Sequence, residues 1–173
     1  LNSLIRIPAV KKVFAENGYA MMFEKNDFII LPVVYQNIYK GALGEVAGRA
    51  ILESKGIKLS AITDATKFEK FDYCLSENKD VYVDFKNWSE NDAVSSAQYK
   101  EKCFSKLQKI GGKAVFVVNV AASSFQIHKS YNNQVIEIST LCKNKNHDLL
   151  YELDSFEMGK IIDSFKEIIY GNL

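Results

Sequence analysis

Several residue types and patterns on which whole protein classes depend are scarce or missing in this 173-residue sequence. It contains no run of about 18 apolar residues, so no segment is expected to cross a membrane, and no signal peptide is recognisable. Its three cysteines are widely spaced and form no Cys-x-x-Cys pair. This spacing argues against a zinc ribbon or a disulfide scaffold and favours a reducing compartment, so we expect a cytoplasmic protein.

Histidine and net charge are also scarce. The two histidines, His128 and His147, are isolated from each other, which argues against a histidine-based nuclease or a zinc hydrolase. The formal net charge is only +1, so any nucleic-acid binding must come from a local basic patch. Hydrophobic residues at 47% and charged residues at 25% are typical of one soluble globular domain with a substantial core. Since the sequence begins with Leu1, we expect it to be part of a larger polypeptide.

What the sequence does have is a pair of short alternating segments, residues 71–76 and 81–86, joined by a polar turn. Side chains alternate between the two faces of a strand. In the first segment one face is expected to carry Phe71, Tyr73 and Leu75, and the other Asp72, Cys74 and Ser76. In the second segment the faces are expected to carry Val81, Val83 and Phe85, and Tyr82, Asp84 and Lys86.

The register of this hairpin brings two acidic residues together. A hairpin that turns about Asn78 pairs residues equally distant from it, so Asp72 is expected opposite Asp84, with Cβ atoms roughly 4.5–5.5 Å apart. Facing carboxylates repel each other, but a hard divalent cation such as Mg²⁺ between them would remove the repulsion. Lys86, on the same face as Asp84, would then contact a metal-bound water or a phosphate oxygen. The alternative is a half-exposed ribbon with scattered surface charges.

These residues resemble a known family. Asp72, a spacer and Asp84-Phe85-Lys86 resemble the core of the PD-(D/E)XK nuclease superfamily, and residues 39–45 resemble its first-helix motif, in which a glutamate (here Glu45) completes the site. The resemblance covers residues 39–120 in the order helix, strand, strand, helix, strand. The sequence departs from the family pattern at Phe71, where the family name has proline.

The resemblance implies a restriction-endonuclease-like α/β/α fold, with a central mixed β-sheet flanked by helices. It implies Mg²⁺-dependent hydrolysis of phosphodiester bonds, with Mn²⁺ as a substitute, and we favour a DNA endonuclease over an enzyme acting on RNA. The implied metal ligands are Glu45, Asp72, Asp84 and the carbonyl of Phe85, and Lys86 would orient the nucleophile. Two alternatives stay open: an inactive nucleic-acid-binding module of the same fold in a larger assembly, and an interaction domain in which the acidic pair is incidental.

A helix is predicted over residues 41–55. Its apolar stripe is expected to hold Leu43, Val46, Ala47, Ala50 and Ile51. Glu45 is expected on roughly the opposite side, next to Gly41, Gly44, Gly48 and Leu52. Each glycine weakens a helix by about 1 kcal/mol relative to alanine, so this face is expected to meet a closely approaching backbone. The alternative for Glu45 is a solvated surface position.

A second helix, over residues 93–110, is predicted to follow the hairpin. Its apolar face holds Cys103, Phe104, Leu107 and Ile110, and the opposite face holds Gln98, Lys102, Lys106 and Lys109. This basic face is expected to follow a phosphate backbone, and family resemblance places Gln98 and Lys102 near the metal. A solvated lysine face is the alternative. Trp88 is expected either to stack on a base or, more commonly for a single tryptophan, to pack on the core.

The remaining segments complete the expected organisation. Residues 1–38 are predicted as an extension, a helix over 8–17 and a hairpin of strands 19–23 and 28–34, that adds a layer or a homodimer contact. Residues 39–173 form the nuclease-like domain, with further strands at 57–62, 113–120, 125–128 and 134–139 and a polar loop at 143–146. Asp154 and Glu157 are expected to cap a final helix, docked on the core by Phe156, Ile161, Ile162, Phe165, Ile168 and Ile169.

Overall fold

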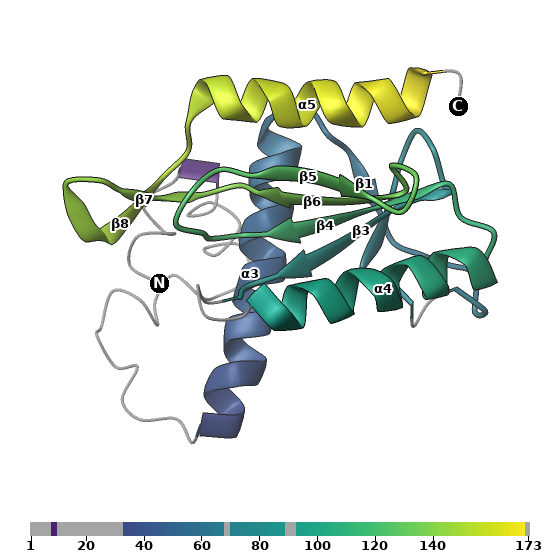
Figure 1. Ribbon diagram of the computed structural model, residues 1–173, viewed down its shortest axis with the longest axis horizontal. Coiled ribbons are helices and arrows are strands. Elements are labelled where there is room, and N and C mark those ends of the chain that lie inside the picture. The colour runs from purple at the N-terminus through teal and green to yellow at the C-terminus, as the bar shows by residue number, and fades with distance from the viewer. Residues whose placement is uncertain (1–7, 10–32, 68–69, 89–92, 172–173) are drawn as a thin grey trace.

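Six strands form one mixed sheet in the order β1-β2-β3-β4-β6-β5, and three helices pack around it in the part of the chain that the structure describes (Figure 1). The structure is a computed structural model that describes residues 8–9, 33–67, 70–88 and 93–171. The helices are α3 (Val33–Ser54), α4 (Ala93–Lys109) and α5 (Ser155–Tyr170). The sheet strands are β1 (Leu59–Ser60), β2 (Tyr73–Leu75), β3 (Val81–Lys86), β4 (Ala114–Asn119), β5 (Ile127–Ser130) and β6 (Val135–Ser139).

The middle of the sheet is parallel and its edges are antiparallel. Strand β3 pairs in parallel with β4, and β4 with β6, while β1, β2 and β5 pair antiparallel with their neighbours. Helix α4 makes the crossover between β3 and β4, as parallel pairing requires. The predicted central position of the strand at 113–120 is therefore confirmed. A separate hairpin of β7 (Cys142–Asn144) and β8 (His147–Glu152) stands where only a polar loop was predicted.

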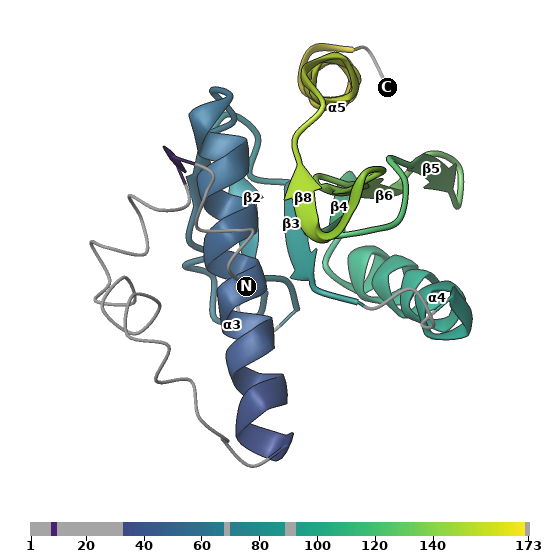
Figure 2. The same ribbon diagram turned by 90° about the vertical axis from the view of Figure 1, so that its left-hand side faces the viewer.

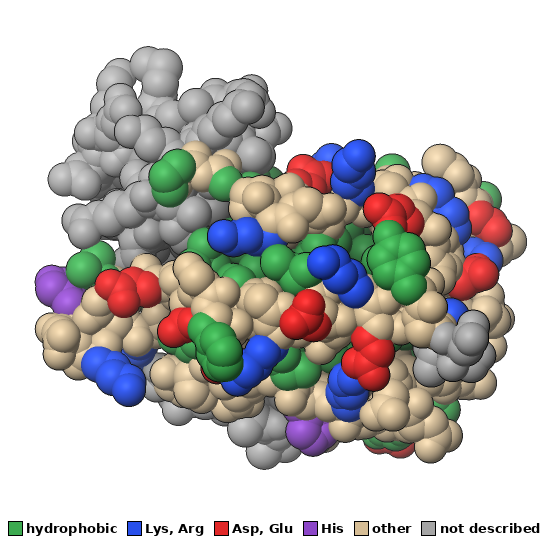
Figure 3. All heavy atoms as spheres, turned by 90° about the horizontal axis from the view of Figure 1, so that it is seen from above, with side chains coloured by type: hydrophobic (Ala, Val, Ile, Leu, Met, Phe, Trp, Pro, Cys, Tyr) green, Lys and Arg blue, Asp and Glu red, His purple; other side chains and the backbone are tan. Residues whose placement is uncertain are grey.

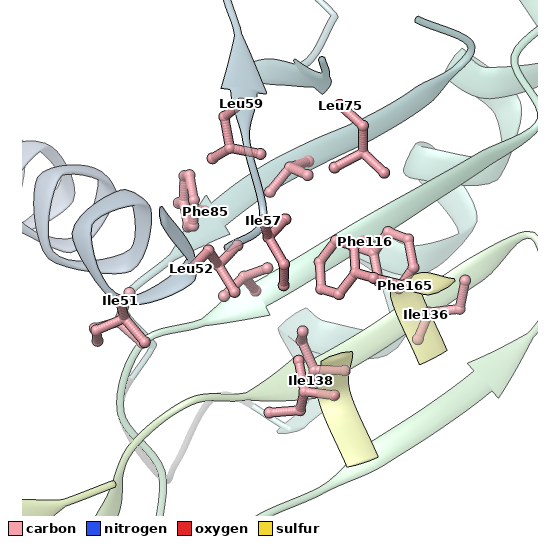
Figure 4. Packing of buried hydrophobic residues seen from close by; sticks show 14 of the residues in the cluster. Ile51, Leu52, Ile57, Leu59, Leu75, Phe85, Phe116, Ile136, Ile138 and Phe165 are labelled. Atoms are coloured by element: carbon pink, nitrogen blue, oxygen red, sulfur yellow. The ribbon is translucent and has the colours of Figure 1, made fainter. Parts of the chain in front are cut away.

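Helices cover both faces of the sheet (Figure 2). Helices α3 and α5 pack on one face through a large apolar cluster, in which the rings of Phe116 and Phe165 stack 3.8 Å apart (Figure 4). Helix α4 packs on the other face through a smaller cluster that includes Cys103 and Leu107. The predicted α/β class, with a mixed sheet flanked by helices, is confirmed. None of the described helices is long and apolar enough to span a bilayer.

Strand β3 has the alternation that its sequence predicts. Val81, Val83 and Phe85 belong to the cluster under α3 and α5, whereas Tyr82 belongs to the cluster under α4. The first five residues of β3 are buried and only Lys86 is partly exposed. The alternative of a half-exposed ribbon is therefore wrong, because helices pack against both faces of this strand.

The predicted hairpin register is also confirmed: Tyr73 pairs with Val83 and Cys74 with Tyr82. Continuing this register by one residue places Asp72, immediately before β2, opposite Asp84. One face assignment is wrong. Phe71 lies in the cluster under α4, with its ring centroid 5.2 Å from that of Tyr82, because it precedes the strand and does not continue its alternation.

Helix α3 is longer than predicted, and its buried face is wider: Ala47, Ala50 and Ile51 of the predicted apolar stripe are buried, and the buried face extends beyond them. Gly44, Gly48 and Leu52, expected beside Glu45 on the outer side, are buried. A Cβ built on Gly48 would lie 2.4 Å from the Phe85 ring, and one on Gly44 would lie 2.9 Å from Cβ of Asn87. A close approach at these glycines was predicted and is found, but the approaching groups are the side chains of Phe85 and Asn87 and not a backbone, as was predicted.

The N-terminal predictions fall largely outside the described residues. Pro8 and Ala9 are helical, as predicted. Val33 and Val34 are in α3, so the predicted strand over 28–34 is wrong at these two residues, and residues 10–32 are not described. The division into 1–38 and 39–173 stays a prediction, and its boundary lies within α3.

The final helix is capped by Asp154 as predicted, whereas the side chain of Glu157, the predicted second capping residue, pairs with Lys160. The Asp154 side chain accepts hydrogen bonds from the amides of Phe156 and Glu157, and Met158, Ile161, Phe165 and Ile168 are buried against the sheet. The predicted docking of Phe156 is wrong. This side chain is 72% exposed in the first turn, where the ammonium of Lys160 lies 4.6 Å from its ring centroid.

Candidate active site at the carboxyl end of β3

The four residues predicted to be catalytic come from three elements that meet at the carboxyl end of β3. Asp84 and Lys86 are on β3, and Asp72 immediately precedes β2, at the register position opposite Asp84. Glu45 is on α3, between Gly44 and Gly48, which pack against Asn87 and Phe85 at this end of β3. The close helix packing that the glycines permit therefore brings Glu45 to the same end of the sheet.

Asp84 is a buried carboxylate with two partners, an ammonium group and a hydroxyl group. The residue is 4% exposed, and its Oδ2 lies 2.6 Å from the ammonium nitrogen of Lys86. The hydroxyl of Tyr99, on α4, donates a hydrogen bond to the same oxygen. An ionised carboxylate is costly to bury unless it is paired and hydrogen-bonded, and these two contacts meet that condition.

Tyr99 belongs to the site, although the sequence reasoning missed it. Its ring centroid lies 4.6 Å from the Lys86 ammonium and 5.3 Å from the Trp88 ring, which meets it edge-on. Burial, and next the charge of Asp84, raise the pKa of the Tyr99 hydroxyl well above its ordinary value, so the group is a proton donor at neutral pH. A signal existed in the sequence: Tyr99 is at helical spacing from Cys103 and Leu107, on the buried face of α4.

Asp72 is electrostatically linked to the other three residues. Its Oδ2 accepts a hydrogen bond of 2.7 Å from the Phe85 amide. The residue as a whole is exposed, but desolvation of the carboxyl group, followed by the charge of Asp84 and a smaller contribution of Glu45, raises its pKa to about 6. The Phe85 amide and the Lys86 charge oppose this shift. The two aspartates therefore repel each other here, as the register predicts.

Glu45 is held in place by a second tyrosine. The Tyr73 hydroxyl donates a 2.8 Å hydrogen bond to Oε1 of Glu45, and the guanidinium of Arg49 lies 5.1 Å from the Tyr73 ring centroid. Arg49 in turn pairs with Glu53 at 3.0 Å. Burial, and next the hydrogen bond to Glu45, raise the pKa of Tyr73. Glu45 is thus half-buried and anchored to β2. The alternative of a solvated surface position does not fit this arrangement.

The donor atoms suit a hard cation, but they are few. Within the described ranges no three His, Cys, Asp or Glu side chains come close enough together to hold one metal ion. Mg²⁺ needs no such cage, because it keeps several waters and is usually bound by one or two carboxylates and substrate phosphates. Asp72 and Asp84, with the Phe85 carbonyl next to them, fit that donor set. Glu45 is held by Tyr73, and its charge is close enough to contribute to the raised pKa of Asp72.

The predicted nucleic-acid contacts divide into two groups. Gln98 and Lys102 are exposed on α4. Lys106 instead donates a 3.2 Å hydrogen bond to the carbonyl of Lys70 and lies 5.7 Å from the Phe71 ring centroid. Trp88 packs on Tyr99, and its amide donates to Oδ1 of Asn119, which is the packing role expected for a single tryptophan. Contact of these four residues with nucleic acid stays a prediction.

Other surfaces of the described chain offer less. On the face formed by α5, acidic and basic side chains are intermixed (Figure 3), partly as ion pairs such as Lys129–Glu167 and Lys160–Glu157. A hollow of about 610 Å³ lies between the β7–β8 hairpin and the start of α5. Its Asp154 caps α5 and its Glu157 pairs with Lys160, so these carboxylates already serve the fold.

No protein-family model matches this sequence, and no curated protein matches it either. The function is therefore inferred from the residues of the site.

Proposed function

We propose that this protein is a metal-dependent nuclease with a restriction-endonuclease-like fold, which hydrolyses phosphodiester bonds in DNA. The observation that carries the proposal is the buried Asp84, paired with Lys86 at the end of a central strand and opposite Asp72 in the hairpin register. The order α3, β2, β3, α4, β4 supports it, because the PD-(D/E)XK resemblance implies a helix, a strand hairpin, a second helix and a further strand; the two-residue strand β1 is an addition between α3 and β2. Ligands of α/β sheets also commonly bind at the carboxyl ends of the strands.

Asp72, Asp84 and the carbonyl of Phe85 would hold Mg²⁺ or Mn²⁺, with Glu45 at the outer hydration shell. The repulsion that raises the pKa of Asp72 supports this assignment, because a cation between the two carboxylates would remove it. A bound divalent cation supplies a Lewis acid that polarises the phosphodiester and offsets developing negative charge.

The chain's own residues supply the remaining functions. Lys86, held beside Asp84, would orient the attacking water and stabilise negative charge on the phosphate oxygens. Gln98 and Lys102, exposed on α4, would contact backbone phosphates, with Lys102 neutralising one charge. Lys106 would do so only on leaving its hydrogen bond to the Lys70 carbonyl. Tyr73 fixes the Glu45 carboxylate, so that it is already oriented when the substrate arrives.

The test is cleavage of labelled DNA and RNA with Mg²⁺ or Mn²⁺, against EDTA controls, by the parent, Asp84→Asn and Asp80→Asn. Asn keeps an acceptor for Tyr99, whereas Asp84→Ala would leave a buried hydroxyl and the Lys86 ammonium without this partner. We expect Asp84→Asn to lose on the order of 10³-fold or more in rate, because the cation's contribution is worth several kcal/mol. Asp80, exposed at the other end of the same hairpin, is the matched control and should cleave as the parent does.

One observation favours a second candidate. In the described chain no three carboxylates come close enough together to hold one ion, and Lys86 already neutralises Asp84. This arrangement would also suit an inactive nucleic-acid-binding module of the same fold. Salt-sensitive binding of DNA without metal-dependent cleavage would favour the module. Equal cleavage rates for Asp84→Asn and the parent would refute the assigned active site.

A further inference from the structure

Three tyrosine hydroxyls in the described chain donate to carboxylates. They are Tyr73 to Glu45, Tyr99 to Asp84, and Tyr170 to Glu77. The first two lie at the candidate active site, and the third lies on the surface. Tyr73 and Tyr99 each also have a cation over the ring, but only the cation over Tyr99, the Lys86 ammonium, belongs to a residue predicted to be catalytic; the cation over Tyr73 is Arg49.

We propose that Tyr99 is a positioning residue of this site: its hydroxyl fixes the Asp84 carboxylate, and its ring holds the Lys86 ammonium beside it. This inference rests on the proposed nuclease function. It assigns to helix α4 a part in the chemistry that is separate from phosphate binding by the exposed Gln98 and Lys102.

The contacts define how Tyr99 would act. The Tyr99 hydroxyl and the Lys86 ammonium both contact Oδ2 of Asp84, so they fix the rotation of the carboxylate about its last side-chain bond. We assign the other oxygen, Oδ1, to the cation. The face of an aromatic ring attracts a cation within about 6 Å of its centroid. The Lys86 ammonium, at 4.6 Å, is within this range.

The surroundings make Tyr99 a rigid support. Its ring packs on the cluster that includes Cys103 and Leu107, and Trp88 meets it edge-on. Trp88 is itself fixed by the hydrogen bond from its amide to Asn119 on β4. A tyrosine side chain has only two rotatable bonds before its ring and hydroxyl, so little movement of the hydroxyl is left once the ring is packed.

The substitutions separate the two contacts. Tyr99→Phe removes the hydroxyl and keeps the ring under Lys86, whereas Tyr99→Leu removes both. Tyr170→Phe is the matched control, because it deletes the same kind of tyrosine–carboxylate hydrogen bond outside the site. Binding of Mn²⁺ is measured by the electron paramagnetic resonance signal of the free ion, and kcat is measured on labelled DNA at saturating Mn²⁺. Thermal unfolding checks that each variant is folded.

We expect Tyr99→Phe to weaken Mn²⁺ binding about 10- to 100-fold, the usual cost of losing a group that orients a metal ligand, with a smaller change in kcat. Tyr99→Leu should match it in Mn²⁺ affinity and lose more kcat, because Lys86 is released as well. Tyr170→Phe should change neither quantity. If Tyr99→Leu does not fold, Tyr99→Phe alone decides the question.

The outcomes separate the two proposals. If the parent binds Mn²⁺ and cleaves DNA while Tyr99→Phe has the parent's Mn²⁺ affinity, the role of Tyr99 is refuted and the nuclease stands. If the parent neither binds Mn²⁺ nor cleaves, both proposals fail.

Discussion

The two faces of strand β3 are alike where the strand begins and differ where it ends. Toward α3 and α5 the strand presents Val81, Val83 and Phe85, all at most 6% exposed within one continuous apolar cluster. Toward α4 it begins with the buried ring of Tyr82 and ends with Asp84 and Lys86. The six residues of β3 therefore face two kinds of environment, an apolar core on one face and an ion pair at the end of the other.

The apolar face of β3 belongs to the part of the fold that provides stability, whereas its polar end carries the candidate site. Burial of apolar side chains stabilises a fold by about 25 cal/mol per Å². A buried ion pair is a weak source of stability, because desolvation offsets much of the attraction. Residues that lower stability in this way are expected at functional sites. Substitutions on the apolar face should therefore change stability, and substitutions on the polar end should change metal binding and activity.

The largest effect is expected from Phe116→Ala, which breaks the apolar face. Phe116 is fully buried on β4 and stacks on Phe165, so its truncation should cost about 3–5 kcal/mol in the free energy of unfolding. Phe156→Ala is the matched control and should change stability by less than about 0.5 kcal/mol, because Phe156 is 72% exposed. Urea unfolding measures both. Equal losses for the two variants would contradict the packing described for this face.

An intermediate effect is expected from Gly48→Ala. Gly48 packs on the Phe85 ring on the apolar face, and the Phe85 amide binds Asp72 at the polar end, so this substitution should affect both. The new Cβ would lie 2.4 and 2.6 Å from two atoms of the Phe85 ring, so the ring must shift, at a cost of about 1–3 kcal/mol. The Phe85 amide also binds Asp72, so Mn²⁺ affinity should fall as well. Gly41→Ala, in the same helix with nothing within 4 Å, should instead stabilise by roughly 0.5–1 kcal/mol. A Gly48→Ala variant as stable as Gly41→Ala would contradict the close contact of α3 with β3.

The pattern of the sequence predicted β3 well, because alternation along a strand depends on neighbouring residues only. It assigned Val83 and Asp84 to opposite faces, and the symmetry of the turn predicted the pairing of Tyr73 with Val83. The extension of the buried face of α3 to Gly44 and Gly48 was not predicted, since glycine carries no hydrophobic signal. The β7–β8 hairpin was missed because β7 has only three residues, and because the apolar residues of β8, Leu149, Leu150 and Tyr151, are consecutive and do not alternate with polar ones.

The candidate site was predicted only in part, for a related reason. Asp72, Asp84 and Lys86 follow from local spacing and a family resemblance. The residues that hold them do not, because Tyr99 is 15 positions from Asp84, and Tyr73 is 28 positions from Glu45. Such contacts depend on how α4 and α3 pack on the sheet. The spacing within α4 places Tyr99 on the buried face of the helix, but it does not identify Asp84 as the partner of its hydroxyl.

The smallest effect is expected in the pH dependence of stability that Asp72 causes, measured on protein kept free of metal with EDTA. It tests whether the polar end of β3 carries two carboxylates that repel each other. Burial and the charge of Asp84 raise the pKa of Asp72 from an ordinary 3.8 to about 6, so between these values the folded protein holds a proton that the unfolded chain has lost. Stability should therefore fall as the pH rises through this range and stay lower above it.

Asp72→Asn should remove this contribution, because asparagine carries no charge and still accepts the hydrogen bond from the Phe85 amide. The variant should be more stable than the parent at pH 7.5 by about 1 kcal/mol or less, since solvent screens an exposed residue, and equally stable near pH 4. Urea unfolding at both pH values measures the difference, with Asp80→Asn as the control. Mg²⁺ at pH 7.5 should stabilise the parent and not Asp72→Asn, because binding to the folded state alone raises its stability. Parallel pH profiles for the two proteins would mean that Asp72 and Asp84 do not repel each other, and the polar end of β3 would then lack the charge pair that a cation needs.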